Sequence, residues 1–174
     1  AGIWRYLIGD TIRFVDKERA EIIITGRTKH FLSLVGEHLS VDNMNKAIQM
    51  ASEQFNICIP EFTVCGVPHG NFFAHQWYIA CDDAKADPVK IGSYIDDCLK
   101  ELNDDYAVER NSALKEVRLQ VLKESQFMDF MLQKGKIGGQ HKFPRVLKGK
   151  MLEDWNAFLA AATISTKENA KLSA

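Results

Sequence analysis

Asp10 and two cations downstream of it could bind a nucleotide. Asp10 follows Gly9 at the end of the segment YLIGD, and a carboxylate can accept hydrogen bonds from the vicinal hydroxyls of a ribose. Arg27 and Lys29 lie further along the chain and could bind oxygens or phosphates of the same nucleotide. The spacing alone also fits a turn at the end of a strand, with Arg27 as a solvated side chain.

A second candidate site is the glycine-rich basic loop from Gly135 to Arg145. Glycines let a backbone approach a ligand closely, and Lys142 offers a compact positive charge that could neutralise a phosphate or a developing anion. The loop lacks the G-x-x-x-x-G-K-[ST] pattern of a P-loop, because Phe143 follows the lysine. Pro144 stiffens the chain beyond it. An exposed surface loop without a ligand is the alternative interpretation.

The cysteines and histidines do not have the spacing of a metal site. No C-x-x-C pair occurs, and the cysteines lie in or beside apolar runs, which favours buried free thiols. The five histidines form no H-x-x-x-H or H-x-H set, so we assign no metal. A disulfide between Cys65 and Cys81 stays open, although nothing else in the sequence indicates an oxidising compartment.

The composition is that of an ordinary globular protein. The 174 residues are 46% hydrophobic and 26% charged, which is enough for one substantial core or two small ones. The 22 Lys and Arg residues are balanced by 23 Asp and Glu residues. The chain therefore has no overall positive electrostatic field that would hold a nucleic acid or an anionic membrane. Neither a long apolar stretch nor a secretory signal is present. We expect a cytoplasmic protein without nucleic-acid or membrane partners.

The N-terminal segment predicts a β-hairpin. Strands are expected over 3–14 and 20–25, with a polar turn over 16–19. A two-stranded hairpin is marginal in water, so it must pack on this chain or on a missing part of it. Residues 27–37 are interpreted as a linker. The chain begins at Ala1 in the middle of a pattern, as expected of a domain cut from something longer, although removal of an initiator Met gives the same start.

The rest of the chain predicts an α+β body. Apolar spacing predicts helices from Ser40 to Asn56 and from Asp87 to Asn103, a short helix after Ser125 that ends near Gly135, and a final helix over 150–162. Strands are expected over 57–67, 71–81 and 116–122, the first two antiparallel. The predicted fold class is therefore α+β, with a small mixed or antiparallel sheet of three or more strands covered by helices.

Three motifs resemble those of a known enzyme family. The segment YLIGDTI at 6–12 resembles the Y-R-L-G-D-V-V motif of the acyl-acid amido synthetases, known from plants as the auxin-responsive promoter family. This family has bacterial members and belongs to the adenylate-forming, luciferase-like superfamily. The segments ITGRTK at 24–29 and LVGE at 34–37 resemble the superfamily's hinge, and GGQHKFPR at 138–145 resembles N-Q-Y-K-x-P-R. Order and spacing agree along essentially the whole chain.

The resemblance implies a two-step reaction and assigns residues to it. A carboxylic acid and ATP would give an acyl-adenylate and pyrophosphate, and an amine, usually an amino acid, would then form the amide. Asp10 would bind the ribose hydroxyls, Arg27 would help to hold the nucleotide, and Lys29 would lie at the hinge. Lys142 would be catalytic, because it would offset the charge of the pentavalent transition state. Rotation about the hinge would then replace the lysine loop with another surface.

The resemblance also implies a domain organisation. Residues 1–29 would be a β-hairpin and hinge leading from a missing N-terminal domain, and residues 30–174 the C-terminal α+β lid domain. The phosphate loop and acyl pocket of the large domain are absent from this sequence. We therefore expect a ligase that uses ATP with Mg only in the full polypeptide, and a chain that alone binds no cofactor tightly and is inactive. Its partners would be the N-terminal adenylation domain, a small-molecule acid, and an amine or amino acid.

Two departures leave the substrates open. Ser33 stands where the superfamily's hinge continuation carries a lysine, which puts acyl transfer to coenzyme A by the usual route in question. His141 and Phe143 flank Lys142 where plant relatives have Tyr and a small or β-branched residue, so the acid and the amine are not defined. The alternative function is a standalone α+β interaction or nucleotide-sensing module derived from the same domain.

Overall fold

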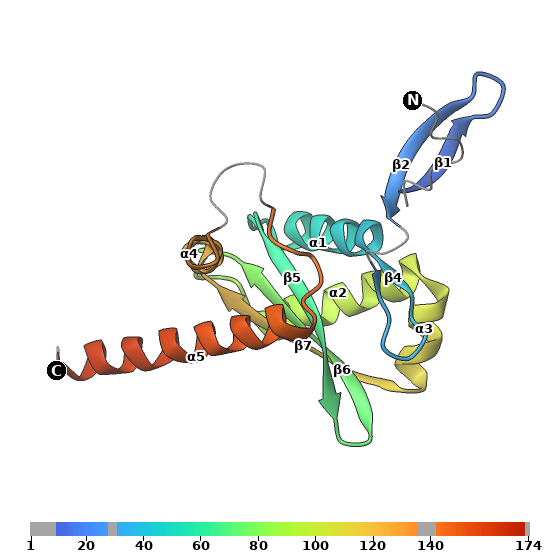
Figure 1. Cartoon of the computed structure of the whole chain (residues 1–174). Coiled ribbons are helices and arrows are strands. Elements are labelled where there is room, and N and C mark those ends of the chain that lie inside the picture. Colours follow the sequence, from blue (N-terminus) through green and yellow to red (C-terminus); the bar gives the residue numbers. More distant parts are fainter. Residues whose placement is uncertain (1–9, 28–30, 136–141, 173–174) are drawn as a thin grey trace, which may run out of the picture.

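The N-terminal hairpin is formed by β1 (Asp10–Asp16) and β2 (Glu21–Arg27). It belongs to a computed structural model that describes residues 10–27, 31–135 and 142–172 (Figure 1). The carboxylate of Asp16 accepts hydrogen bonds from the N–H groups of Glu18 and Arg19, which closes the turn. The hairpin prediction is confirmed from residue 10 onward, and the predicted strand residues 3–9 lie outside the described ranges.

A mixed sheet of three strands forms the centre of the body. Strand β5 (Phe62–His69) pairs antiparallel with β6 (Phe72–Ala80), and β6 pairs parallel with β7 (Leu114–Leu122). Gly70, at φ 59°, makes the turn between β5 and β6. A parallel pair needs a long crossover, and helices α2 (Pro88–Leu102) and α3 (Asp104–Asn111) supply it. The predicted fold class is confirmed, with the sheet in its mixed form.

Helices cover both faces of this sheet (Figure 1). Alternate residues of a strand point to opposite faces: Trp77 and Ile79 pack with α1 (Val41–Phe55) and α2. Tyr78 and Ala80 belong to a second core with α4 (Glu124–Gln133) and α5 (Gly149–Leu172). The sheet therefore separates two hydrophobic cores.

Capping residues set the ends of the helices on the first face. The Ser40 hydroxyl accepts a hydrogen bond from the N–H of Asn43 at the start of α1, and Asp87 caps α2 in the same way. Asn103 both ends α2 and accepts the N–H of Tyr106 at 2.8 Å, which begins α3. Helix α3 is missing from the sequence prediction, because Tyr106 is its one buried residue and no apolar stripe marks it.

Residues 31–40 are part of the folded body, so the interpretation of 27–37 as a linker is wrong from Phe31 onward. Strand β3 (Phe31–Leu32) pairs antiparallel with β4 (Leu39–Ser40), and Leu32 and Leu39 are buried in the first core. Two other bounds differ from the prediction by more than two residues. Residues 57–61 precede β5 rather than belonging to it, and α5 continues to Leu172.

All four cysteines are free thiols. Cys65, Cys81 and Cys98 are buried as predicted, whereas Cys58 is exposed. Burial raises the pKa of Cys65 to about 12, so this thiol is unreactive at neutral pH. Within the described ranges, no helix combines the length and the apolar character needed to cross a membrane.

Candidate functional site

Asp10 and Arg27, the two predicted nucleotide-binding residues, are brought together by the hairpin. They are cross-strand partners at the end of the β1–β2 ladder that lies away from the turn. Residues directly opposite each other in a ladder have Cβ atoms about 4.5–5.5 Å apart, so one ligand can contact both positions. Lys29, the predicted hinge residue, lies outside the described ranges.

Apolar side chains are exposed on both faces of this hairpin. Ile12 is 49% exposed and Ile24 is 68% exposed, and four neighbours share this character: Phe14, Val15, Ile22 and Ile23. Because successive strand residues alternate between faces, neither face of the hairpin is covered by the body of the domain. Exposed apolar patches of this kind mark an interaction surface.

Lys142, the predicted catalytic residue, is exposed at the start of a segment that returns to the sheet. Its ammonium forms no ion pair with any other residue in the described part of the chain. The segment runs beside β5, whereas the hairpin projects beyond the N-terminal end of α1 (Figure 1). The structure therefore does not place Lys142 beside the Asp10–Arg27 pair.

The segment after Lys142 is attached to the edge of β5. The N–H of Val64 donates to the carbonyl of Arg145 at 3.0 Å, and the N–H of Leu147 donates to the carbonyl of Val64 at 2.9 Å. Val146 forms an isolated parallel bridge with Val64. The Thr63 hydroxyl also donates to the carbonyl of Pro144 at 2.7 Å. Lys142 thus stands a few residues from a fixed point on the sheet.

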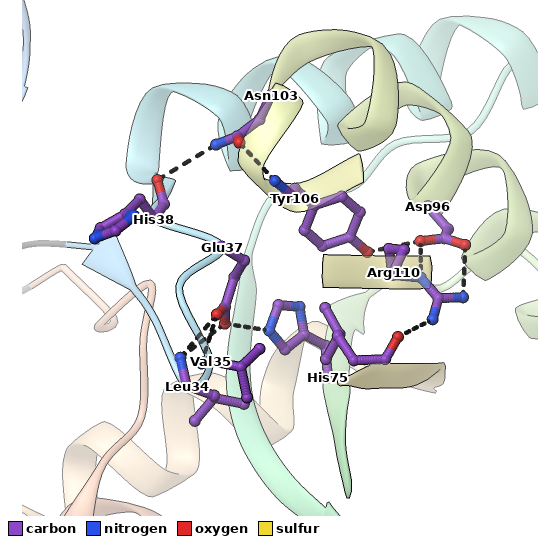
Figure 2. A network of polar contacts seen from close by, with 10 residues as sticks. Leu34, Val35, Glu37, His38, His75, Asp96, Asn103, Tyr106 and Arg110 are labelled. Carbon is purple, nitrogen blue, oxygen red and sulfur yellow. Dashed lines mark hydrogen bonds and ion pairs between the residues drawn. The ribbon is translucent and has the colours of Figure 1, made fainter. Parts of the chain in front are cut away.

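A buried carboxylate ties the segment after the predicted hinge to the sheet. Glu37 and His75 are both 0% exposed, and His75 Nε2 lies 2.9 Å from Glu37 Oε1 (Figure 2). The same carboxylate accepts the N–H groups of Leu34 and Val35 at 2.9–3.0 Å. Burial alone would raise the pKa of Glu37, but the hydrogen bonds from His75, Val35 and Leu34 lower it to about 2.

A second buried cluster lies next to this pair. The Tyr106 hydroxyl donates to Asp96 Oδ1 at 2.7 Å, and Arg110 donates to both carboxylate oxygens of Asp96 at 2.7 and 2.9 Å. The rings of Tyr106 and His75 lie 5.8 Å apart, and Figure 2 shows the two clusters side by side. Although burial opposes it, hydrogen bonds from Arg110, Lys100 and Tyr106 lower the pKa of Asp96. The carboxylates of both clusters are hydrogen-bonded within the protein, although the buried Nδ1 of His75 has no hydrogen-bond partner among the described residues. We interpret both clusters as structural.

A groove of about 500 Å³ between α2 and β7 contains none of the predicted site residues. Two of its cations are already paired, Arg110 with Asp96 and Arg118 with Glu116 at 2.6 Å. Within the described ranges, no group of three or more His, Cys, Asp or Glu side chains could hold a metal ion. No site is assigned to this groove.

The fold is that of an α+β domain, and the sequence of this domain matches a known protein family. The GH3 family C-terminal domain matches residues 42–150, and the chain belongs to this family. The matched range includes Lys142 and confirms the family that the motifs predict.

Two solved structures show the same fold. One, titled "GH3.15 acyl acid amido synthetase", has a TM-score of 0.70 and 18% identity, and the match covers 90% of this chain and 31% of that one. The other, titled "AtGH3.15 acyl acid amido synthetase in complex with 2,4-DB", has a TM-score of 0.65 and 21% identity, with 86% and 29% covered. The chain thus spans about a third of the length of these structures. No curated protein sequence matches it.

Proposed function

We propose that the chain is the C-terminal lid domain of an ATP-dependent acyl-acid amido synthetase of bacterial type. The observation that carries the proposal is membership of the GH3 C-terminal domain family over residues 42–150. The fold shared with two acyl acid amido synthetase structures about three times longer supports it. The domain would be inactive until the N-terminal adenylation domain of the same polypeptide completes the site.

The proposed reaction has two balanced steps. A carboxylate oxygen of the acid would attack the α-phosphorus of ATP, so that a new O–P bond forms as the bond to pyrophosphate breaks. The amine nitrogen would then attack the acyl carbon, AMP would leave with the electron pair of the C–O bond, and the nitrogen would lose a proton to solvent. Mg²⁺ would enter bound to ATP, and no step is assigned to a metal held by this chain.

Each predicted site residue has a place in this scheme. Lys142 would extend its ammonium to the phosphate and carboxylate oxygens during the first step, where its charge offsets the growing negative charge. Asp10 would accept the ribose hydroxyls, and Arg27, its cross-strand partner, would hold the same nucleotide. The Asp10–Arg27 pair and Lys142 lie apart in this fold (Figure 1). A rotation at Lys29 would carry the lysine to the nucleotide and away from it again.

The exposed hairpin would be the contact with the N-terminal domain. Apolar residues are exposed on both of its faces, and packing against a larger domain of the same polypeptide would bury them. The buried free thiols suit the reducing cytoplasm, where we propose that the enzyme works.

Pyrophosphate exchange tests the proposal. The full polypeptide encoded with this domain should incorporate labelled pyrophosphate into ATP when a suitable acid is present, and residues 1–174 alone should not. Calorimetry on residues 1–174 should show no tight ATP binding, because most of the nucleotide contacts would be missing. Micromolar ATP binding by the isolated chain, with no exchange by the longer polypeptide, would instead support a nucleotide-sensing module.

A further inference from the structure

We propose that Arg145 is a positioning residue for Lys142, an inference that rests on the proposed function. Its guanidinium fixes the segment that carries the lysine to the edge of β5. It acts through the backbone between the two residues and does not itself contact the nucleotide.

The backbone attachment of this segment is short. It consists of one bridge, at Val64 and Val146, with a hydrogen bond on either side of Val64. A pairing of this length gives little stability without side-chain contacts. Side chains therefore have to hold the residues that follow Lys142 in place.

The Arg145 side chain provides that hold through three contacts. Nη1 forms an ion pair with Glu61 Oε1 and donates to the carbonyl of Phe62 at 3.0 Å. The guanidinium also lies over the Phe62 ring, 4.2 Å from its centroid, a favourable cation–π arrangement. With less than a third of the Arg145 and Glu61 side chains exposed, this ion pair is shielded from solvent better than a surface pair.

Phe143 provides a second anchor, on the other side of the segment. Its ring is buried in the second core, 4.9 Å from the Phe127 ring and 5.1 Å from the Trp155 ring. Phe143 and Arg145 are two residues apart, so the chain next to Lys142 is held at the core and at the strand edge. Lys142 is the first residue before these anchors, and its side chain is exposed.

This arrangement matters for the rate of adenylation. A catalytic group displaced by about 1 Å can lose roughly 100-fold in rate. Loss of the Arg145 guanidinium would free the segment from Glu61 and Phe62, while Phe143 would keep the domain folded. The expected defect is therefore specific to the step that uses Lys142.

The test compares Arg145→Gln with Arg118→Gln in the full polypeptide. Arg118 is a matched control, because it also pairs with a glutamate at the sheet but is far from Lys142 in sequence. Arg145→Gln should lower kcat for pyrophosphate exchange by about 10- to 100-fold with KM for ATP nearly unchanged, and Arg145→Lys should recover part of the loss. Amide formation from a preformed acyl-adenylate should keep its rate.

A readout independent of activity uses residues 1–174. The amide of Leu147 should exchange with deuterium at least about tenfold faster in Arg145→Gln than in the parent or in Arg118→Gln, because its hydrogen bond opens more often. Unchanged exchange at Leu147, or equal losses in both half-reactions, overturns the positioning role. If the wild-type full polypeptide shows no acid-dependent pyrophosphate exchange, that result overturns the proposed function instead. The catalytic basis of this inference is then removed as well.

Discussion

Asp10 and Arg27 occupy the same rung of the β1–β2 ladder, at the end of the hairpin that lies away from its turn. The sequence motifs that contain them are separate, and the strand register joins them into one candidate nucleotide site. A ribose and a phosphate of one nucleotide lie close enough together to be bound by such a pair.

Substitution of this pair should weaken ATP binding. Asp10→Asn in the full polypeptide should raise KM for ATP about tenfold, the equivalent of one charged hydrogen bond, and Arg27→Gln should have a similar effect. Arg13→Gln, at an exposed position on the same strand, is the control and should leave KM unchanged. Unaltered KM in both site variants would remove the pair from nucleotide binding.

The Glu37–His75 pair should contribute strongly to stability. Glu37→Gln leaves the N–H groups of Leu34 and Val35 without a carboxylate and should lower the free energy of unfolding by about 3 kcal/mol at pH 7. Glu101→Gln, on the exposed side of α2, should change it by less than about 0.5 kcal/mol. Urea unfolding of residues 1–174 measures both values, and equal stabilities would contradict the role assigned to Glu37.

The same pair predicts a pH dependence with a definite sign. The pKa of Glu37 falls from 4.5 to about 2 on folding, so the unfolded chain binds the proton more readily than the folded one. The stabilisation is present above the unfolded value of 4.5 and is lost as the pH falls toward 2. The stability difference between the parent and Glu37→Gln should therefore shrink from pH 7 to pH 3. A difference that stays constant over this range would show that ionisation of Glu37 is not its source.

Gly66 should tolerate no side chain while Leu34 is present. A Cβ atom on Gly66 would overlap Leu34 Cδ2, so Gly66→Ala should destabilise the domain by about 1–3 kcal/mol. The double variant Gly66→Ala/Leu34→Ala relieves the overlap, and its loss should be smaller than the sum of the two single losses. Thermal unfolding of the four proteins measures this coupling, and strictly additive losses would mean that the two residues do not touch.

The exposed hairpin should matter only in the longer polypeptide. Ile24→Lys should leave the stability of residues 1–174 within about 0.5 kcal/mol of the parent, since this side chain is 68% exposed. In the full polypeptide it should lower the melting temperature, because the charge would be buried against the N-terminal domain. Val108→Lys, at a 63% exposed position on α3, is the control. Equal melting temperatures for both full-length variants would place the interface elsewhere.

Local signals in the sequence account for much of the fold. Ser40 and Asp87 mark the starts of α1 and α2, and alternating or bulky residues mark the three central strands. Helix α3 is missing from the prediction because it buries one side chain, and β3 and β4 are too short to show a period. The parallel pairing of β7 depends on the crossover, which strand patterns do not reveal.

The candidate site could be predicted only in part. Asp10, Arg27 and Lys142 follow from motifs, but the pairing of Asp10 with Arg27 depends on the strand register, in which two bulges shift the ladder and cancel each other. Glu37 and His75 are 38 residues apart, and Arg145 and Glu61 are 84 apart. Such contacts arise from tertiary packing, for which a single sequence carries no local signal.

The most direct test of the proposed function is pyrophosphate exchange by Lys142→Ala in the full polypeptide, compared with Lys85→Ala at an exposed position in the loop before α2. Loss of a charge that stabilises the transition state should lower kcat by about 100-fold or more, whereas Lys85→Ala should exchange at the parent rate. Exchange by Lys142→Ala at the parent rate would contradict the assignment of this segment as the adenylating lid.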